Sequence, residues 1–373
     1  MKNSIRISAA MFICCLGTVL LQAATKDEIK NAISKGAKAK ITFRVVDSKG
    51  NPVSGAQVGA GFFNQNMRGD GAGVSGKTDS NGLFAATGEP TGDMSYGITK
   101  EGYYKTEGSY WFYRANDTNT VKDGRWQPWN PTNTVVLKEI RNPVPMFARE
   151  LEIKMPVQNI PVGFDFEKGD WIAPYGDGIK PDMLIRYSNT NTGPGFLDFS
   201  RQLEMTFGNT NDGILVLPID GSSTLHSLYE APESGYGPNL LLQEDMTTYK
   251  IIKQVELDAN HYAIFRARSV TNDSGRIVSA NYGKIYGPIQ YGILDERKYI
   301  RFESYYFNPD GTRNLEFNIK SNLFLVPKYE KIEEFRKQAQ AKGQIMSVDD
   351  IDTLSRMEKE RRDFQERIGY PPP

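Results

Sequence analysis

The sequence predicts a mainly β protein with two β-sandwich domains and an α-helical tail at its C-terminus. Three observations predict this class. Apolar residues alternate with polar ones through many short runs, the pattern of half-buried strands. Turn-forming Gly, Pro, Asn and Asp residues separate these runs. Aromatic residues, which favour strands, make up 11% of the 373-residue chain. Because no helical pattern interleaves with the strands between residues 41 and 326, sandwiches are favoured over an α/β architecture.

The first 23 residues have the order of a secretory signal. Lys2 and Arg6 precede an apolar run from 7 to 21, and Leu21-Gln22-Ala23 offers a small residue at the cleavage position. The run is shorter than the roughly 20 apolar residues that span a bilayer, so a cleaved signal is predicted rather than a membrane anchor. We therefore expect an exported protein, periplasmic or extracellular, with no transmembrane segment after signal removal.

Cleavage would change the chemistry of the chain. It removes Cys14 and Cys15, so neither a disulfide nor a thiol is expected in the mature protein. It leaves 43 basic against 45 acidic residues, a formal charge of −2. No cluster of Lys and Arg accompanies this balance, and no nucleic-acid partner is expected. About 350 residues remain, enough for two domains with sizeable cores.

The apolar period changes near residue 41. Residues 24–40 are polar and predict a polar spacer or a short helix, whereas residues 41–45 alternate as a strand does. Asp47 to Pro52 supplies turn chemistry, with Gly50 free to adopt positive φ. A second strand follows, and one of its faces is predicted to be buried: Ala56, Val58, Ala60 and Phe62.

These elements carry a family resemblance over residues 41–141. The stretches that carry it are, in order, the first strand, Asp47…Gly50-Asn51-Pro52-Val53-Ser54-Gly55-Ala56-Gln57-Val58, Thr78-Asp79-Ser80-Asn81-Gly82-Leu83-Phe84 and Gly102-Tyr103. In this spacing the region resembles the carboxypeptidase regulatory-like domain, a transthyretin-like, immunoglobulin-like β-sandwich of secreted and surface proteins. The segment after Phe63 is longer than is usual in that family, and Tyr110 to Trp129 looks like an insertion. The resemblance implies a structural or binding accessory module.

The remainder of the chain resembles no characterised family. Asn142-Pro143-Val144-Pro145 predicts a short, stiff linker. Residues 142–326 predict a second, jelly-roll-like β-sandwich, in which the clearest hairpin joins 299–307 to 314–319 through Asn308-Pro309-Asp310-Gly311. Residues 327–373 predict a helical tail with one apolar stripe, which packs on its own domain or binds a partner.

Sequence motifs for catalysis are absent. Neither His226 nor His261 is followed by Glu three residues later, as a zinc carboxypeptidase would require. The chain has no Gly-x-Ser-x-Gly elbow. The Gly-rich stretch at 69–78 ends in Gly-Lys-Thr, but it precedes no helical pattern, which a phosphate-binding loop requires. No catalytic residue, metal site or cofactor is therefore predicted. The carboxylates of Asp165, Glu167 and Asp170, close to Trp171 in the sequence, leave a glycan-active enzyme as an alternative.

The tryptophans give the most specific functional hypothesis. All four lie within 61 residues, and together with one tyrosine they form the candidate ligand-binding set: Trp111, Trp126, Trp129, Trp171 and Tyr175. Flat aromatic faces flanked by Asn and Asp suit sugar rings, whereas burial at a domain junction is the competing interpretation. Trp126 and Trp129 lie in an irregular stretch and are expected to be exposed, whereas the strand position of Trp111 predicts burial.

Together these observations predict an exported, non-catalytic binding or structural protein, with a glycan or another envelope protein as its partner. A glycan-active enzyme using the carboxylates near Trp171 is one alternative. A subunit of a cell-envelope assembly, docked through the helical tail, is another.

Overall fold

The computed structural model describes residues 26–64, 66, 73–113, 121–191, 198–219, 221–247, 250–254, 257–294, 297–324 and 337. The predicted signal at 1–23 and, apart from Lys337, the predicted helical tail at 327–373 lie outside the described residues. Within the described part, strands dominate and one α-helix is present, so the mainly β class is confirmed. That helix, α1 (Lys26–Lys35), occupies the segment expected to be a spacer or a short helix.

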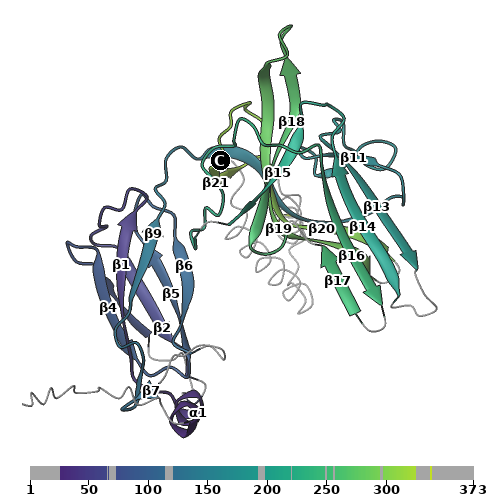
Figure 1. The fold of residues 1–373 in the computed structure, drawn as a ribbon. Coiled ribbons are helices and arrows are strands. Elements are labelled where there is room, and N and C mark those ends of the chain that lie inside the picture. Colours follow the sequence, from purple (N-terminus) through teal and green to yellow (C-terminus); the bar gives the residue numbers. More distant parts are fainter. Residues whose placement is uncertain are drawn as a thin grey trace, which may run out of the picture. The chain divides into compact units, whose positions relative to one another are not determined.

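The chain forms two compact units, which Figure 1 displays. The first unit comprises residues 1–100 and 105–136, and the second comprises 101–104 and 137–373. The short segment 101–104 belongs to the second unit because its backbone pairs there. The Tyr104 N–H donates to the Lys138 carbonyl and the Ile140 N–H to the Gly102 carbonyl, each at 2.8 Å.

The first unit contains two main sheets. One has the order β4-β1-β9, from β1 (Ala39–Asp47), β4 (Leu83–Gly88) and β9 (Thr132–Leu137). The other has the order β3-β2-β5-β6, from β2 (Gln57–Phe62), β3 (Gly73–Lys77), β5 (Asp93–Thr99) and β6 (Thr106–Trp111). A small ribbon joins β7 (Val121–Lys122) to β8 (Arg125–Trp126).

Alternation of side chains builds the core of the first unit. The predicted inward face of β2 is confirmed, since Ala56, Val58, Ala60 and Phe62 are all buried. Phe43 of β1 meets Tyr96 of β5 with ring centroids 5.1 Å apart, so aromatic rings connect the two sheets. Because side chains of a strand point alternately to opposite faces, the other residues of β2 and β5 face outward.

The second unit is built on two six-stranded sheets. The first has the order β15-β18-β19-β20-β10-β21, from β10 (Val144–Lys154), β15 (Gly213–Pro218), β18 (His261–Thr271), β19 (Ile277–Leu294), β20 (Arg297–Asn308) and β21 (Phe317–Asn322). The second has the order β12-β11-β13-β14-β16-β17, from β11 (Val162–Asp165), β12 (Asp170–Trp171), β13 (Met183–Asn191), β14 (Phe199–Thr206), β16 (Asn239–Thr247) and β17 (Lys250–Gln254).

Residues from both six-stranded sheets share one hydrophobic core. Aromatic rings dominate its centre: Phe166, just after β11, stacks on Phe265 of β18 at 4.4 Å and meets Tyr305 of β20 at 5.1 Å. Such rings bury a large apolar area per residue. A second, smaller layer covers the opposite face of the β18-β19-β20 sheet, where Tyr262, Tyr282 and Leu315 are buried.

The predicted hairpin between residues 299–307 and 314–319 is wrong. The first strand and the turn form as expected, but β21 pairs in parallel with β10, on the far side of that strand from β20. β10 occupies the edge of β20 instead, with Phe147 opposite Phe307. Asn308 redirects the chain, because its amide donates to the carbonyls of Thr312 and Asn314 at 3.3 and 3.0 Å.

The described residues contain no helix with the length and apolar character needed to cross a membrane.

Candidate functional site

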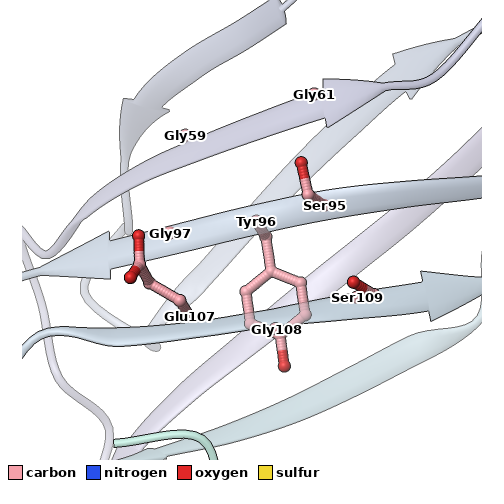
Figure 2. Close-up of a pocket in the computed structure, with 8 residues that line it drawn as sticks. All are labelled: Gly59, Gly61, Ser95, Tyr96, Gly97, Glu107, Gly108 and Ser109. Atoms are coloured by element: carbon pink, nitrogen blue, oxygen red, sulfur yellow. The ribbon is translucent and has the colours of Figure 1, made fainter. Parts of the chain in front are cut away.

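The outward face of the β3-β2-β5-β6 sheet forms an open platform of small residues (Figure 2). Cross-strand pairing places Gly61 beside Ser95 and Ser95 beside Ser109, and places Gly59 beside Gly97. A shallow hollow of about 540 Å³ lies over these residues. Since the glycines carry no side chain, a flat ligand can approach the sheet closely.

An aromatic ring and a carboxylate end the platform. Trp111, the last residue of β6, is 48% exposed and lies directly opposite Asp93 of β5. Residues opposite each other in an antiparallel pair project from the same face, so Trp111 and Asp93 stand side by side. Partial burial raises the pKa of the Asp93 carboxyl. The pair offers a flat apolar face next to a hydrogen-bond acceptor.

A second carboxylate lies within the platform. Glu107 of β6 is opposite Gly97, and its side chain leans over that glycine, where an added Cβ would meet Oε1 at 3.6 Å. Glu107 also forms an ion pair with Lys105 at 2.6 Å, and the two side chains are 57% and 50% exposed. Exposed pairs of this kind are weak, so Glu107 can exchange this partner for a ligand hydroxyl.

The expected exposures of Trp111 and Trp126 are reversed in the structure. Trp126 is fully buried, its indole N–H donates to the Pro90 carbonyl at 2.9 Å, and its ring lies 6.0 Å from Tyr113. The irregular stretch that carries Trp126 folds back through the β7-β8 ribbon and buries the ring. Trp111 lies on the outward side of an alternating strand, so its strand position does not bury it.

The other candidate aromatics occupy separate places. Trp129 is 40% exposed, under the guanidinium of Arg125 at 5.1 Å, in a loop that pairs with β1 rather than with the platform. Trp171 of the second unit is buried against Phe164, and its indole N–H donates to the Lys154 carbonyl at 2.9 Å. Tyr175 is exposed in the same unit. Of the five predicted residues, Trp111 alone lies on the platform.

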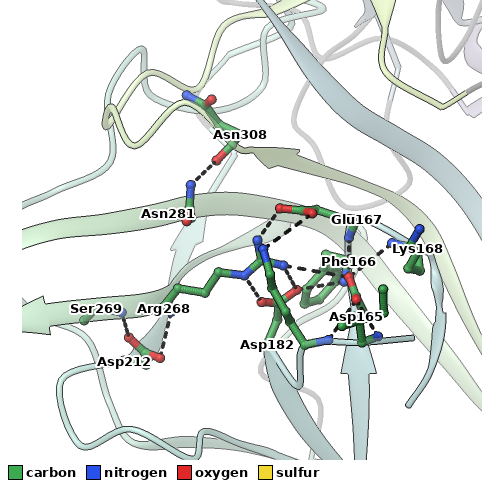
Figure 3. Close-up of polar contacts among 12 residues, drawn as sticks. Asp165, Phe166, Glu167, Lys168, Asp182, Asp212, Arg268, Ser269, Asn281 and Asn308 are labelled. Carbon is green, nitrogen blue, oxygen red and sulfur yellow. Dashed lines mark hydrogen bonds and ion pairs between the residues drawn. The ribbon is translucent and has the colours of Figure 1, made fainter. Parts of the chain in front are cut away.

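The carboxylates of the alternative enzyme hypothesis have protein partners (Figure 3). Asp165 is buried and accepts backbone N–H bonds from Glu167 and Lys168 on one oxygen and from Ile179 and Lys180 on the other, at 2.9–3.1 Å. Burial would raise the pKa of Asp165, but these four donors outweigh it and lower the pKa. Asp170 accepts from the N–H groups of Trp171 and Asp177.

Arg268 neutralises the same cluster. Its Nε lies 2.6 Å from Asp182 Oδ1, another of its nitrogens lies 3.8 Å from Asp165, and it also pairs with Glu167. Arg268 has a positive φ of 58°, and Asp212 holds that backbone by accepting the N–H groups of Arg268 and Ser269. Burial raises the pKa of Asp182, while the guanidinium opposes that rise. This arrangement is that of a structural ion-pair network.

The platform was not among the predicted sites, although the sequence contains a signal for it. Gly59 and Gly61 alternate with the buried Val58, Ala60 and Phe62, and Ser95 and Gly97 alternate with Met94 and Ile98. Small residues at several successive outward positions of neighbouring strands indicate an uncovered flat face. Recognising it requires the pairing of β2 with β5, strands more than 30 residues apart in the chain.

Comparisons with known proteins give no family. No protein-family model and no curated protein matches the chain. Among solved structures, 3-chlorocatechol 1,2-dioxygenase from Rhodococcus opacus 1CP shares 14% identity at a TM-score of 0.23, over 29% of this chain and 62% of its own. Catechol 1,2-dioxygenase from Acinetobacter radioresistens shares 16% at the same TM-score, over 30% and 55%. This chain thus spans less than two thirds of those chains, and likeness at this level carries no argument about activity.

Proposed function

We propose that this protein is an exported, non-catalytic binding protein whose platform holds a neutral glycan. The single observation that carries the proposal is the half-exposed Trp111 at the end of a glycine and serine face, with Asp93 beside it. The first unit then acts as a binding module of the carboxypeptidase regulatory-like kind, and both units are β-sandwiches. The predicted secretory signal at residues 1–23 supports a location outside the cytoplasm.

The chemistry of the platform suits a sugar ring. The C–H groups of a pyranose stack on an indole face, and its hydroxyls bond to short polar side chains. Asp93 accepts a hydrogen bond from a sugar hydroxyl next to the stacking ring, while the hydroxyls of Ser95 and Ser109 both donate and accept hydrogen bonds. Gly59 and Gly97 leave space for the neighbouring ring of an extended chain. Because Asp93 and Glu107 are carboxylates, uronic acids and sulfated sugars are repelled.

Glycan binding by the full chain after signal removal tests the proposal. An array of neutral and acidic oligosaccharides identifies ligands, and isothermal titration measures their affinity. We expect neutral oligosaccharides to bind and Trp111→Ala to weaken them several-fold, since a stacked ring contributes about 0.5–1.5 kcal/mol beyond its buried area.

Trp129→Ala is the matched control. It removes another exposed indole of the first unit, in a loop away from the platform, and should leave glycan affinity unchanged. Absence of neutral oligosaccharide binding by the wild-type protein would contradict the proposal. An equal loss of affinity in the two variants would assign binding to another surface.

A further inference from the structure

A lysine is buried in the second unit. Lys284, in the middle of β19, is 2% exposed and projects from the face of the sheet opposite the shared core. Its Nζ donates to the Leu315 carbonyl at 2.7 Å and to the Ser227 hydroxyl at 3.0 Å. A lysine is almost never fully buried without an ion-pair partner, so this position calls for an explanation.

The surroundings of Lys284 do not compensate a full positive charge. The ring of Tyr286, on the same strand, lies 5.2 Å from Nζ, and the ring of Tyr306 on β20 lies 4.9 Å from it, but neither ring carries a net charge. The carboxylate of Glu316 is the acidic group that favours the charged lysine. It already accepts hydrogen bonds from the Tyr104 hydroxyl and from the backbone N–H groups of Arg141 and Asn142.

Two further bases face the same region. Lys138 donates to the carbonyls of Leu225 and Ser227, and the ring of His226 lies 5.4 Å from that of Tyr286. Burial lowers the pKa of Lys284 to about 7, against the opposing influence of Glu316. Burial lowers the pKa of His226, and the positive charges of Lys284 and Lys138 lower it further. The site therefore favours the uncharged amine.

The chain segment Leu225–Tyr229 covers Lys284. Side chains hold most of it: Lys138 donates to two of its carbonyls, the Tyr229 hydroxyl donates to the Glu139 carbonyl at 2.8 Å, and the Leu228 N–H donates to the Tyr262 hydroxyl at 3.1 Å. Its backbone bond to another segment is that from the Leu315 N–H to the Tyr229 carbonyl at 2.8 Å. Its other side, through Leu228 and Tyr229, lines a hollow of about 850 Å³. A segment with so few ladder bonds opens at lower free energy than the strands beneath it.

We propose that Leu225–Tyr229 is a proton-linked lid over Lys284, at the edge of this hollow, and that the Lys284 amine is its sensor. When the lid is closed, the amine is buried and neutral. When the lid opens, water reaches Nζ and the amine takes up a proton. Acidification therefore favours the open lid, and alkaline conditions favour the closed one.

Proton binding at Lys284 is linked to lid opening, and this linkage sets the direction and size of the pH dependence. The closed lid holds the pKa of Lys284 near 7, and the solvated amine of the open lid regains the ordinary value of 10.5. Between these values each opening event binds one proton, so the opening constant rises about tenfold for every pH unit of acidification. Below pH 7 the amine is protonated in both states, and its contribution becomes constant.

Native-state hydrogen exchange of the full chain between pH 7 and 9 measures this constant. The reporters are the amides of Leu228 and Leu315, corrected for the intrinsic pH dependence of exchange. We expect an opening constant about fiftyfold larger at pH 7 than at pH 9 in the wild type, because the closed-lid amine is already half protonated at pH 7. Lys284→Met retains the apolar stem without the amine. It should remove this pH dependence and lower the opening constant at pH 7.

Lys138→Met is the matched control, because it removes two bonds to the same segment but leaves the buried amine. In this variant the lid should have a larger opening constant at every pH, and the constant should still change about tenfold per pH unit. A wild-type opening constant that does not change with pH would overturn the proposal, whether or not the variants fold. A slope that persists in Lys284→Met would assign the proton to another group and equally overturn it.

Discussion

Single side chains decide how charge is tolerated inside the second unit. Asp182 is fully buried, and Arg268 is the cation that compensates it. Removing one partner of a buried pair leaves an uncompensated charge, which costs far more than the pair contributes. Two of the carboxylates in the alternative enzyme hypothesis, Asp165 and Glu167, are therefore held in a network centred on Arg268, an arginine about 100 residues away in the chain.

Arg268→Leu should destabilise the second unit by about 3–5 kcal/mol at neutral pH. Without the guanidinium, burial keeps the pKa of Asp182 above its unfolded value, so the folded state prefers the protonated acid. The stability deficit should then shrink as the pH falls towards that folded value. Urea unfolding at pH 7 and pH 5 measures both effects. Arg186→Leu, at a more exposed pair with Glu204, should cost no more than about 1 kcal/mol.

Trp126 and Trp111 supply the second comparison at this scale. Trp126→Ala leaves a cavity in the first unit and should cost about 3–5 kcal/mol of unfolding free energy. Trp111→Ala, on the outward face, should change the melting temperature little while weakening glycan binding. Thermal melts of the two variants measure the difference. Equal destabilisation would mean that the Trp111 ring packs against protein, and the platform would then lose its stacking surface.

At the scale of elements, alternation within one strand could be predicted from the sequence and pairing between strands could not. The buried face of β2 follows from apolar residues at every second position. The partner of β21 does not follow from the sequence. The residues at 308–311 form the same turn whether the next strand pairs with β20 or with β10. The same limit hid the platform, which exists only once β2, β5 and β6 lie side by side. The expected exposures of Trp111 and Trp126 were wrong for the same reason, because burial of each ring depends on which strands pair.

Glycines on the two faces of the first unit should respond oppositely to substitution. An added Cβ at Gly59 would meet only the Gly97 carbonyl at 3.8 Å, whereas at Gly88 it would meet Phe62 at 2.3 Å. Gly59→Val should raise stability by up to about 1 kcal/mol, because valine favours strands and glycine does not. It should also block glycan binding by filling the platform. Gly88→Ala should destabilise. Chemical unfolding and titration together check these outcomes.

For the whole molecule, the two units should respond differently to pH. Each carries its own buried residues, so we expect two unfolding transitions in calorimetry. A buried lysine with a lowered pKa weakens the fold wherever the unfolded chain binds a proton that the native state does not. For Lys284 this interval runs from about pH 7 to its unfolded value of 10.5. Stability of the second unit should therefore rise with pH across that interval.

Each pH unit between 7 and 9 should add about 1.4 kcal/mol to the second unit. For a unit of this size, that corresponds to roughly 3–5 °C in its melting temperature. The transition of the first unit should not follow this trend, because Lys284 lies in the second. In Lys284→Met the upward shift should vanish, and the second unit should melt higher than the wild type at pH 7. A second transition that stays fixed from pH 7 to 9 in the wild type would mean that Lys284 keeps its proton in the folded protein.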